Sequence, residues 1–123
     1  MSTILLVDGD PLQALTRKSI LETKFQNVRR VSDAVEALCL LEQPQFAKML
    51  GVVISSHHGP GITGPAFVAE LHARVPALPV LVLGDDGDSA GNYAGELIHF
   101  LSRPFAKEAM LAATSALLKQ NSH

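Results

Sequence analysis

Short apolar runs that alternate with segments of helical spacing constrain the fold of this chain more than any other feature. The runs are Ile4–Val7, Val28–Val31, Val52–Ser55, Val80–Leu83 and Ile98–Leu101. Arg29 and Arg30 interrupt the second of them, which is therefore expected at an edge of the sheet. Runs of this length are typical of β-strands. Strands that alternate with helices form βαβ units, which build a parallel sheet with helices on both faces. The sequence therefore predicts one doubly wound α/β domain that spans residues 1–123.

Four helices are predicted between and after these strands, over about residues 11–24, 34–43, 65–74 and 107–119. Asp10 is a suitable N-cap for the first helix, and Ser32-Asp33 caps the second, which should end before Pro44. The residues expected to share one apolar face are Leu12, Leu15, Ser19 and Ile20 in the first helix, Val35, Leu38 and Leu41 in the second, Phe67, Val68 and Leu71 in the third, and Met110, Leu111, Thr114, Leu117 and Leu118 in the last.

The segment Gly84–Glu96 departs from this pattern. It contains four glycines and three aspartates where a helix between the fourth and fifth strands is expected. Glycine disfavours a regular helix, so we expect this helix to be shortened or disordered, with at most a turn or two near Ser89–Tyr93. The aspartates lack the ordered ligand positions and the terminal Glu of a calcium loop, so a solvated acidic loop is the better interpretation.

Composition excludes several classes of protein. The net charge of −2 leaves no basic footprint for direct binding of nucleic acid. Cys39 is the one cysteine, so no internal disulfide can form, and its apolar neighbours predict a place in the core. No apolar run approaches the roughly 18–20 residues of a membrane-spanning helix, and the amino terminus enters a strand without a basic region. We therefore expect a cytoplasmic protein without a membrane contact.

A Gly-rich loop follows the third strand directly. Binding sites of open α/β sheets lie at the carboxyl ends of the strands, so Ser56 and its loop should be near any functional site. His57 and His58 come next, but adjacent histidines lack chelate spacing for zinc, and we expect exposed loop residues. Gly59-Pro60-Gly61 lacks the Lys-Ser/Thr of a phosphate-binding loop and is interpreted as a turn.

Five local matches in the order of a known family support a more specific interpretation. They are I-L-L-V-D-x-D-P at residues 4–11, the strand ending at Ser56, P-x-x-x-G at residues 60–64, P-V-L-V-L at residues 79–83 and F-L-S-R-P-F at residues 100–105. Together they resemble the receiver domain of two-component response regulators, over essentially the whole chain. The resemblance implies the flavodoxin-like receiver fold, a five-stranded parallel sheet of order 2-1-3-4-5.

The same resemblance implies a phosphorylation pocket whose usual residues are largely replaced. The position of the phosphorylated aspartate holds Ser56, and the acidic pair that binds Mg²⁺ aligns with Asp8 and Gly9. The Thr/Ser position after the fourth strand is Gly84, and the lysine position is Arg103. Receivers of this family transfer a phosphoryl group with these residues, so the losses remove nucleophile, metal and switch together.

The remaining polar groups predict no metal site, no cofactor and no catalytic residues. Asp8, with Asp10 nearby, retains too few carboxylates for Mg²⁺, which favours oxygen ligands. A serine hydroxyl is a poor nucleophile without a base. Asp8 could still bind a metal, but we expect it to pair with Arg103 across the strand ends. That pair would replace the charge balance of the lost metal site.

These observations predict a pseudo-receiver, a degenerate receiver that regulates through protein contacts without aspartyl phosphorylation. The resemblance places such domains in two-component signal transduction and regulation of transcription, with a protein partner, a homodimer or an effector domain beyond His123 as the output. Phe100, Pro104 and Phe105 lie near the family's switch and partner face. Two alternatives stay open: non-covalent binding of a phosphate or ligand at Arg103, and a small enzyme with Asp8, Asp10, Ser56, His57 and Arg103 in the crevice.

Overall fold

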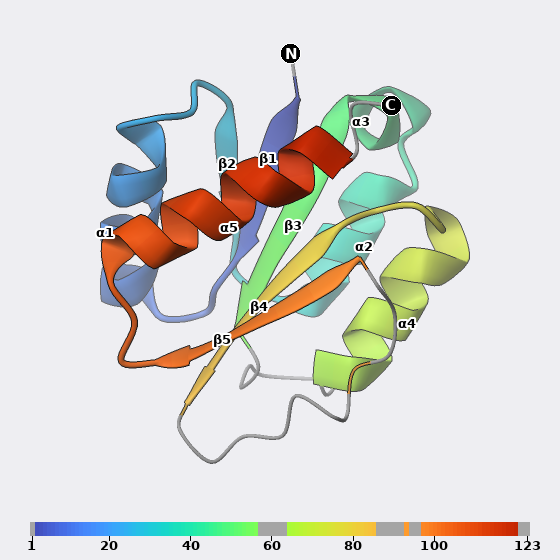
Figure 1. Ribbon diagram of the computed structural model, residues 1–123. Coiled ribbons are helices and arrows are strands. Elements are labelled where there is room, and N and C mark those ends of the chain that lie inside the picture. The colour runs from blue at the N-terminus through green and yellow to red at the C-terminus, as the bar shows by residue number, and fades with distance from the viewer. Residues whose placement is uncertain (1, 57–63, 86–92, 94–96, 121–123) are drawn as a thin grey trace.

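A five-stranded parallel sheet forms the centre of the computed structural model, which describes residues 2–56, 64–85, 93 and 97–120. The strand order is β2-β1-β3-β4-β5, as predicted (Figure 1). The elements in chain order are β1 (Thr3–Val7), α1 (Pro11–Glu22), β2 (Val28–Val31), α2 (Ala34–Leu41), α3 (Pro44–Met49), β3 (Leu50–Ser56), α4 (Gly64–Arg74), β4 (Val80–Asp85), β5 (Ile98–Arg103) and α5 (Lys107–Gln120).

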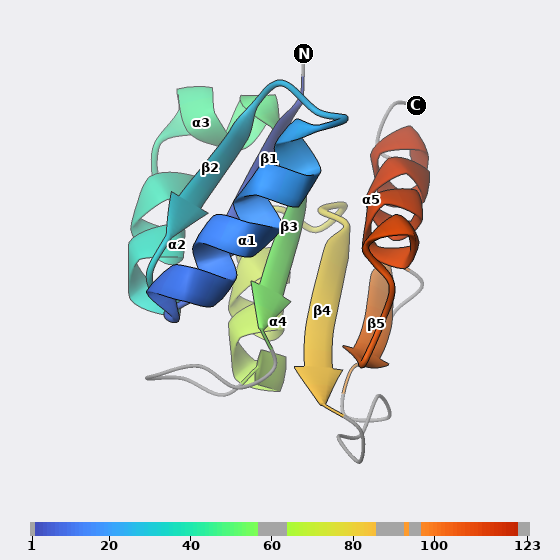
Figure 2. The same cartoon turned by 90° about the vertical axis from the view of Figure 1, so that its left-hand side faces the viewer.

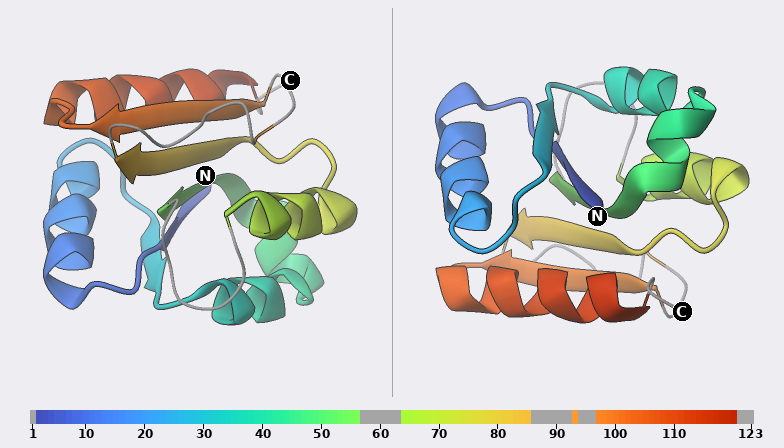
Figure 3. Two further views of the ribbon diagram at one scale, coloured as in Figure 1. Left: turned by 90° about the horizontal axis from the view of Figure 1, so that it is seen from below. Right: turned by 90° about the horizontal axis from the view of Figure 1, so that it is seen from above.

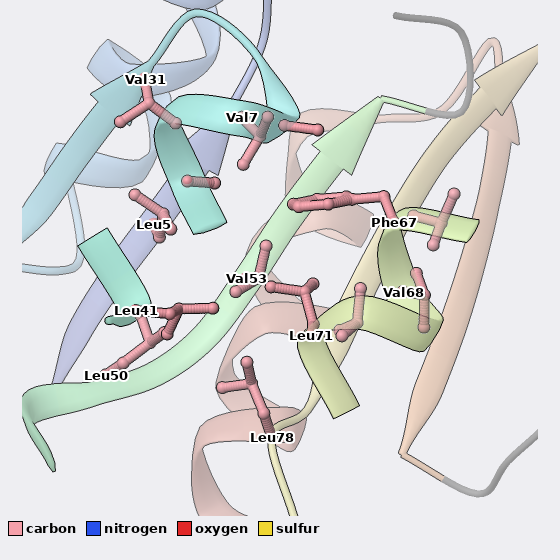
Figure 4. Packing of buried hydrophobic residues seen from close by; sticks show 14 residues of the cluster. Leu5, Val7, Val31, Leu41, Leu50, Val53, Phe67, Val68, Leu71 and Leu78 are labelled. Atoms are coloured by element: carbon pink, nitrogen blue, oxygen red, sulfur yellow. The ribbon is translucent and has the colours of Figure 1, made fainter. Parts of the chain in front are cut away.

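Helices cover both faces of the sheet, with α1 and α5 on one side and α2, α3 and α4 on the other (Figures 2 and 3). Successive side chains of a strand point to opposite faces, so the apolar strands feed two cores. Ile4 and Leu6 of β1 pack toward α1 and α5, whereas Leu5 and Val7 pack toward α2 and α4. In Figure 4, Val53 of β3 faces the helix α4 across this second core. The predicted doubly wound architecture is confirmed.

Both predicted N-caps are present. The Asp10 carboxylate accepts hydrogen bonds from the backbone N–H groups of Leu12 and Gln13, at 3.0 and 3.2 Å. Asp33 accepts one from the N–H of Glu36 at 2.8 Å. The helix α2 ends at Leu41, but a second short helix, α3, begins at Pro44 and was not predicted. Proline suits a first helical position as well as it terminates a preceding helix, so the sequence permits both.

The expected apolar face of α1 is wrong for Leu12, Leu15 and Ser19, which are exposed, whereas Ile20 packs against the core as predicted. Leu12 and Leu15 are 78% and 64% exposed, whereas Ala14, Arg17 and Leu21 form the buried stripe. The two stripes have the same helical spacing, so periodicity alone does not choose between them. The small side chain of Ala14 lets α1 approach the sheet. Arg17 turns inward because a buried carboxylate is available to it, as described below.

The helix α2 shows a similar correction. Val35 is 59% exposed, and the buried residues are Ala34, Ala37 and Leu41. Cys39, expected in the core, is exposed, because it lies on the outer side of this helix. Small alanines at three-residue spacing again face the sheet, and the larger apolar residues lie at the margin. Of the three residues expected on the apolar face, Leu41 is buried and Leu38 packs against the core as predicted, so the prediction is wrong for Val35.

The other helical faces agree with the prediction. Phe67, Val68 and Leu71 of α4 are buried, and so are Met110, Thr114 and Leu117 of α5, while Leu111 and Leu118 pack at the edge of the same core. In the segment predicted to lose its helix, Gly84 and Asp85 belong to β4, and residues 86–92 and 94–96 lie outside the described residues. The predicted exposed loop at His57 and His58 and the predicted turn at residues 59–61 also lie outside them. None of the helices described is long and apolar enough to cross a membrane.

Candidate functional site at the carboxyl ends of the strands

Four of the positions singled out from the sequence meet at one edge of the sheet. Asp8 follows β1, Ser56 ends β3, Gly84 lies near the end of β4, and Arg103 ends β5. In the parallel register Ser56 pairs with Leu83, and Gly84 pairs with Ser102. The carboxyl ends of β3, β4 and β5 therefore lie side by side. The strand pattern of the sequence predicted Ser56 at this edge, and the resemblance to receivers supplied the other three positions.

The centre of the site is Arg17, which sequence reasoning did not identify. Its Nη1 donates a hydrogen bond to the Oδ2 of Asp8 and another to the Oγ of Ser56, each at 3.0 Å. Asp8 and Arg17 are 3% and 7% exposed. One guanidinium nitrogen thus joins the carboxylate after β1 to the hydroxyl at the end of β3. A fixed cation from α1 occupies the space between them.

Asp8 is also held by its other polar atoms. Its Oδ1 accepts a hydrogen bond from the backbone N–H of Asp10 at 3.0 Å. Its backbone carbonyl accepts from both Nε and Nη2 of Arg30, at 3.1 and 2.9 Å. Both carboxylate oxygens are therefore engaged. The side chain of Arg30 in β2 thus fixes the backbone of Asp8 between β1 and α1. The next two residues of this turn, Gly9 and Asp10, are exposed.

The electrostatics of the site are those of a buried ion pair. Burial lowers the pKa of Arg17, the carboxylate of Asp8 raises it, and the positive charge of Arg103 lowers it again. Arginine nevertheless remains charged in proteins, so this pair persists at neutral pH. Removing one partner of a buried pair leaves an uncompensated charge and typically costs about 3–5 kcal/mol. The pair is thus a strong constraint on the site.

Arg103 does not pair with Asp8, so that prediction is wrong. Its Nε donates to the Oδ1 of Asp85 at 2.6 Å, and its Nη2 contacts the same oxygen. Asp85 lies directly opposite Arg103 in the register of β4 and β5, which makes it the nearer partner. Asp8 is satisfied by Arg17 instead. The site therefore holds two separate pairs, one buried and one at the rim.

The rim pair should contribute little to stability. The side chains of Arg103 and Asp85 are 48% and 43% exposed, so water screens their attraction. We expect Arg103→Ala to lower the free energy of unfolding by less than about 1 kcal/mol in urea denaturation. A decrease of about 3–5 kcal/mol, as expected for a buried pair, would show instead that Arg103 makes a buried interaction within the site.

The space left between these residues is small. A cavity of about 40 Å³ is lined by Gln13, Arg17, Ser56, Leu83, Gly84, Asp85 and Arg103. One water molecule takes roughly 30 Å³ of the liquid, so this volume admits a water or two. A phosphoryl group with its metal ion is larger than this volume.

The donors present do not fit the Mg²⁺ ion that the receiver resemblance implies. Mg²⁺ requires near-octahedral oxygen ligands, commonly one or two carboxylates with waters and phosphate. Both oxygens of Asp8 already accept hydrogen bonds, and Asp10 caps α1. Within the residues that the structure describes, no group of three or more His, Cys, Asp or Glu side chains could hold a metal.

The residues expected at a switch and partner face do not form one cluster. Phe100 of β5 is half-buried, packs on the side of α2 and α4, and lies 5.9 Å from the ring of Tyr93 between ring centres. Phe105 packs on the opposite side, with α1 and α5, and Pro104 between them is exposed. The two aromatic residues thus belong to different cores.

Comparisons with known proteins agree with this geometry. No family model matches the chain. It is 29% identical over 119 residues to the C4-dicarboxylate transport transcriptional regulatory protein DctD of Pseudomonas aeruginosa, a match that covers 94% of this chain and 25% of that regulator. A response regulator receiver domain protein from Clostridium thermocellum superposes with a TM-score of 0.84 at 20% identity, over 98% of this chain and 96% of that one. The chain has the receiver fold.

A second solved structure extends the likeness. The signal receiver domain of an HD domain-containing protein from Pseudomonas fluorescens Pf-5 has a TM-score of 0.80 at 26% identity, over 99% of this chain and 98% of that one. Together with the match to DctD, these likenesses show that the chain resembles response-regulator receiver domains in fold. The receiver-like chain spans a quarter of the length of DctD.

Proposed function

We propose that this chain is a pseudo-receiver, which signals through protein contacts without phosphorylation at the usual acceptor position. The observation that carries the proposal is the position of Arg17, whose guanidinium bridges the Asp8 carboxylate and the Ser56 hydroxyl. A receiver that is phosphorylated needs a carboxylate nucleophile and a metal cation at this place. Here a hydroxyl stands for the nucleophile and a side chain of the protein supplies the positive charge.

Three physical effects oppose phosphoryl transfer to Ser56. A hydroxyl needs a base to become an effective nucleophile, and the buried carboxylate of Asp8 is engaged by Arg17. Mg²⁺ would be repelled by the adjacent guanidinium, by several kcal/mol at an effective dielectric constant of about 20. The cavity of about 40 Å³ is smaller than the transferred group with its metal ion. The same small volume, with Arg103 paired to Asp85, disfavours the alternative of phosphate binding at Arg103.

The output of such a domain would pass through its surface. DctD is described as a transcriptional regulatory protein and is four times as long as its match with this chain, so an effector domain beyond His123 that regulates transcription is one recipient. A separate partner protein or a second copy of the chain is the other. In this proposal the domain is not an enzyme, binds no nucleic acid or membrane itself, and acts in the cytoplasm.

A titration with Mg²⁺ and beryllofluoride, a mimic of the acyl phosphate, tests the proposal. We expect no saturable change in the amide NMR shifts of Asp8, Ser56 and Arg103 at millimolar concentrations, because Arg17 holds the pocket. The unrelated surface of α2 serves as an internal reference. Saturable shifts that spread from the pocket to Phe100 would show a working phosphorylation switch and contradict the proposal.

A further inference from the structure

The strand β2 forms an open edge of the sheet. Among the strands it pairs with β1 alone. The backbone N–H of Asp8 donates to the carbonyl of Val31 at 3.1 Å, so the backbone groups of Val31 face β1. Alternate residues of a strand turn these groups to opposite sides, and Val28 and Arg30 therefore turn theirs away from the sheet. Within the described part of the chain, nothing hydrogen-bonds to these outward N–H and C=O groups.

A groove lies along this edge, between β2 and α1. Figure 2 shows the strand and the helix side by side. The groove has a volume of about 660 Å³, and its lining includes Lys18, which pairs with Glu22 at 3.4 Å. We call β2 and this groove together the β2 edge site. Its apolar lining residues are Pro11, Ala14, Leu15 and Val28.

Two arginines of β2 have no acidic partner. Arg29 and Arg30 are successive residues, so their guanidinium groups lie on opposite faces of the sheet. The Arg29 group lies over the ring of Phe46, 5.7 Å from Cζ to the ring centre, and the Arg30 group donates to the carbonyl of Asp8. Neither contacts a carboxylate among the residues that the structure describes. The edge is therefore positively charged on both faces, although the whole chain has a net charge of −2.

We propose that the β2 edge site binds an extended acidic segment of a partner protein, which adds to the sheet as a sixth strand. The backbone of the segment would pair with the outward groups of Val28 and Arg30. Its alternate apolar side chains would pack in the groove, and its carboxylates would face Arg29 on the other side. Hydrogen bonds would supply affinity, and the guanidinium groups would select for acidic sequences.

The charge also excludes a second copy as the occupant. Charged side chains on an edge strand hinder its pairing with an identical edge. Two β2 strands side by side would set Arg29 and Arg30 against their own equivalents, which repel each other, whereas a strand rich in glutamate is attracted. The inference rests on the proposed function, because it names a surface through which the pseudo-receiver makes its protein contact.

The first test uses a synthetic peptide in which valine and glutamate alternate over eight residues. We expect the peptide to slow hydrogen exchange at the amides of Val28 and Arg30, and to leave exchange at Val31 unchanged. Binding should weaken as salt is raised, because exposed charges are screened. A peptide with lysine in place of every glutamate should not bind. Equal binding of the two peptides, or no protection of Val28 and Arg30 at millimolar peptide, overturns the proposal.

Methylation of the peptide backbone separates strand pairing from attraction between charges. One peptide is N-methylated at its valines and another at its glutamates, so both keep every side chain. Only alternate residues of a strand hydrogen-bond to one neighbour, so one methylated peptide should lose affinity and the other should keep it. Equal affinity of the two would show that charge alone holds the peptide and would overturn strand addition.

Variants of the protein locate the contact. Val28→Pro removes one outward N–H at the first residue of β2, a position that tolerates proline, whereas Val28→Ala keeps this donor. We expect the proline variant to bind the peptide more weakly than the alanine variant. Arg29→Glu should weaken binding about tenfold, and Lys119→Glu, the same change of charge on α5, should not. Equal effects within either pair of variants would contradict the proposal.

Two further results bear on the β2 edge site. A dimer in sedimentation that Val28→Pro dissociates would make a second copy the occupant and would overturn the proposal. The peptide experiment is independent of the titration with Mg²⁺ and beryllofluoride. Failure of the peptide to bind overturns the sixth strand and leaves the phosphorylation-independent pocket standing. A working switch at the pocket would contradict the proposed function, and peptide binding would still decide the role of the edge.

Discussion

Replacement of Arg17 by methionine is expected to lower the free energy of unfolding by about 3–5 kcal/mol. Methionine keeps much of the apolar stem of the side chain, so the change removes mainly the charged guanidinium. The Asp8 carboxylate, 3% exposed, would then remain in the interior without its cation. Urea denaturation followed by circular dichroism measures the difference. A loss below about 1 kcal/mol would show that Asp8 reaches water and that the pair is not a buried one.

A double-mutant cycle separates the charge from the packing. Asp8→Asn removes the negative charge but keeps an oxygen that can accept the hydrogen bond from the N–H of Asp10. By itself this variant leaves Arg17 uncompensated and should also destabilise the fold. The double variant Asp8→Asn/Arg17→Met has no buried charge and should recover most of the loss, because replacement of both partners of a buried pair is often neutral. Simple addition of the two single losses would contradict a direct coupling.

The fold could be predicted from the sequence because its strands are unambiguous. Val52, Val53 and Ile54 are completely buried, and a β-branched run of that kind has few other places in an α/β domain. Once the strands are parallel, their carboxyl ends must share an edge, so Asp8 and Ser56 come together without any knowledge of contacts. The strand order itself came from the resemblance to receivers.

The ion pair between Asp8 and Arg17 could not be predicted in the same way. The leucines at positions 12 and 15 made the wrong face of α1 look buried, and the correct face contains a charged residue, Arg17, that hydrophobic patterning excludes. A buried arginine is stabilised by a partner from another element, and helical periodicity carries no information about that partner. The signal that was present is chemical: a carboxylate buried at the strand ends requires a positive charge beside it.

The same limit applied to Arg103 and to Cys39. Arg103 was assigned to Asp8 because both lie at strand ends, but the β4–β5 register gives it Asp85, a residue that the sequence placed in an acidic loop. Cys39 was placed inside because its neighbours are apolar, whereas α2 uses alanines against the sheet and turns Cys39 outward. Local composition predicts that a helix is amphipathic, and packing of the whole domain decides which side is buried.

If Arg17 takes the place of the metal, removing it and restoring the carboxylates should restore a metal site. We expect the triple variant Gly9→Asp/Arg17→Ala/Ser56→Asp to bind Mg²⁺ saturably at millimolar concentrations in isothermal titration calorimetry. The strand ends would then present three carboxylates with no internal cation, and Mg²⁺ favours oxygen ligands of this kind. Because a ligand that binds only the folded state stabilises it, Mg²⁺ at 100 times Kd should raise the free energy of unfolding by about 2.7 kcal/mol. The thermal midpoint should rise accordingly.

The matched control keeps the arginine. Gly9→Asp/Ser56→Asp adds the same two carboxylates, but Arg17 can still bridge the residues after β1 and β3 as it now bridges Asp8 and Ser56. Its guanidinium should repel the divalent ion and satisfy the carboxylates itself, so this variant should bind Mg²⁺ much more weakly than the triple variant. Equal affinity in the two variants would mean that Arg17 does not compete with the metal. The difference between the Mg²⁺ affinities of the two variants measures how strongly Arg17 competes with the metal ion.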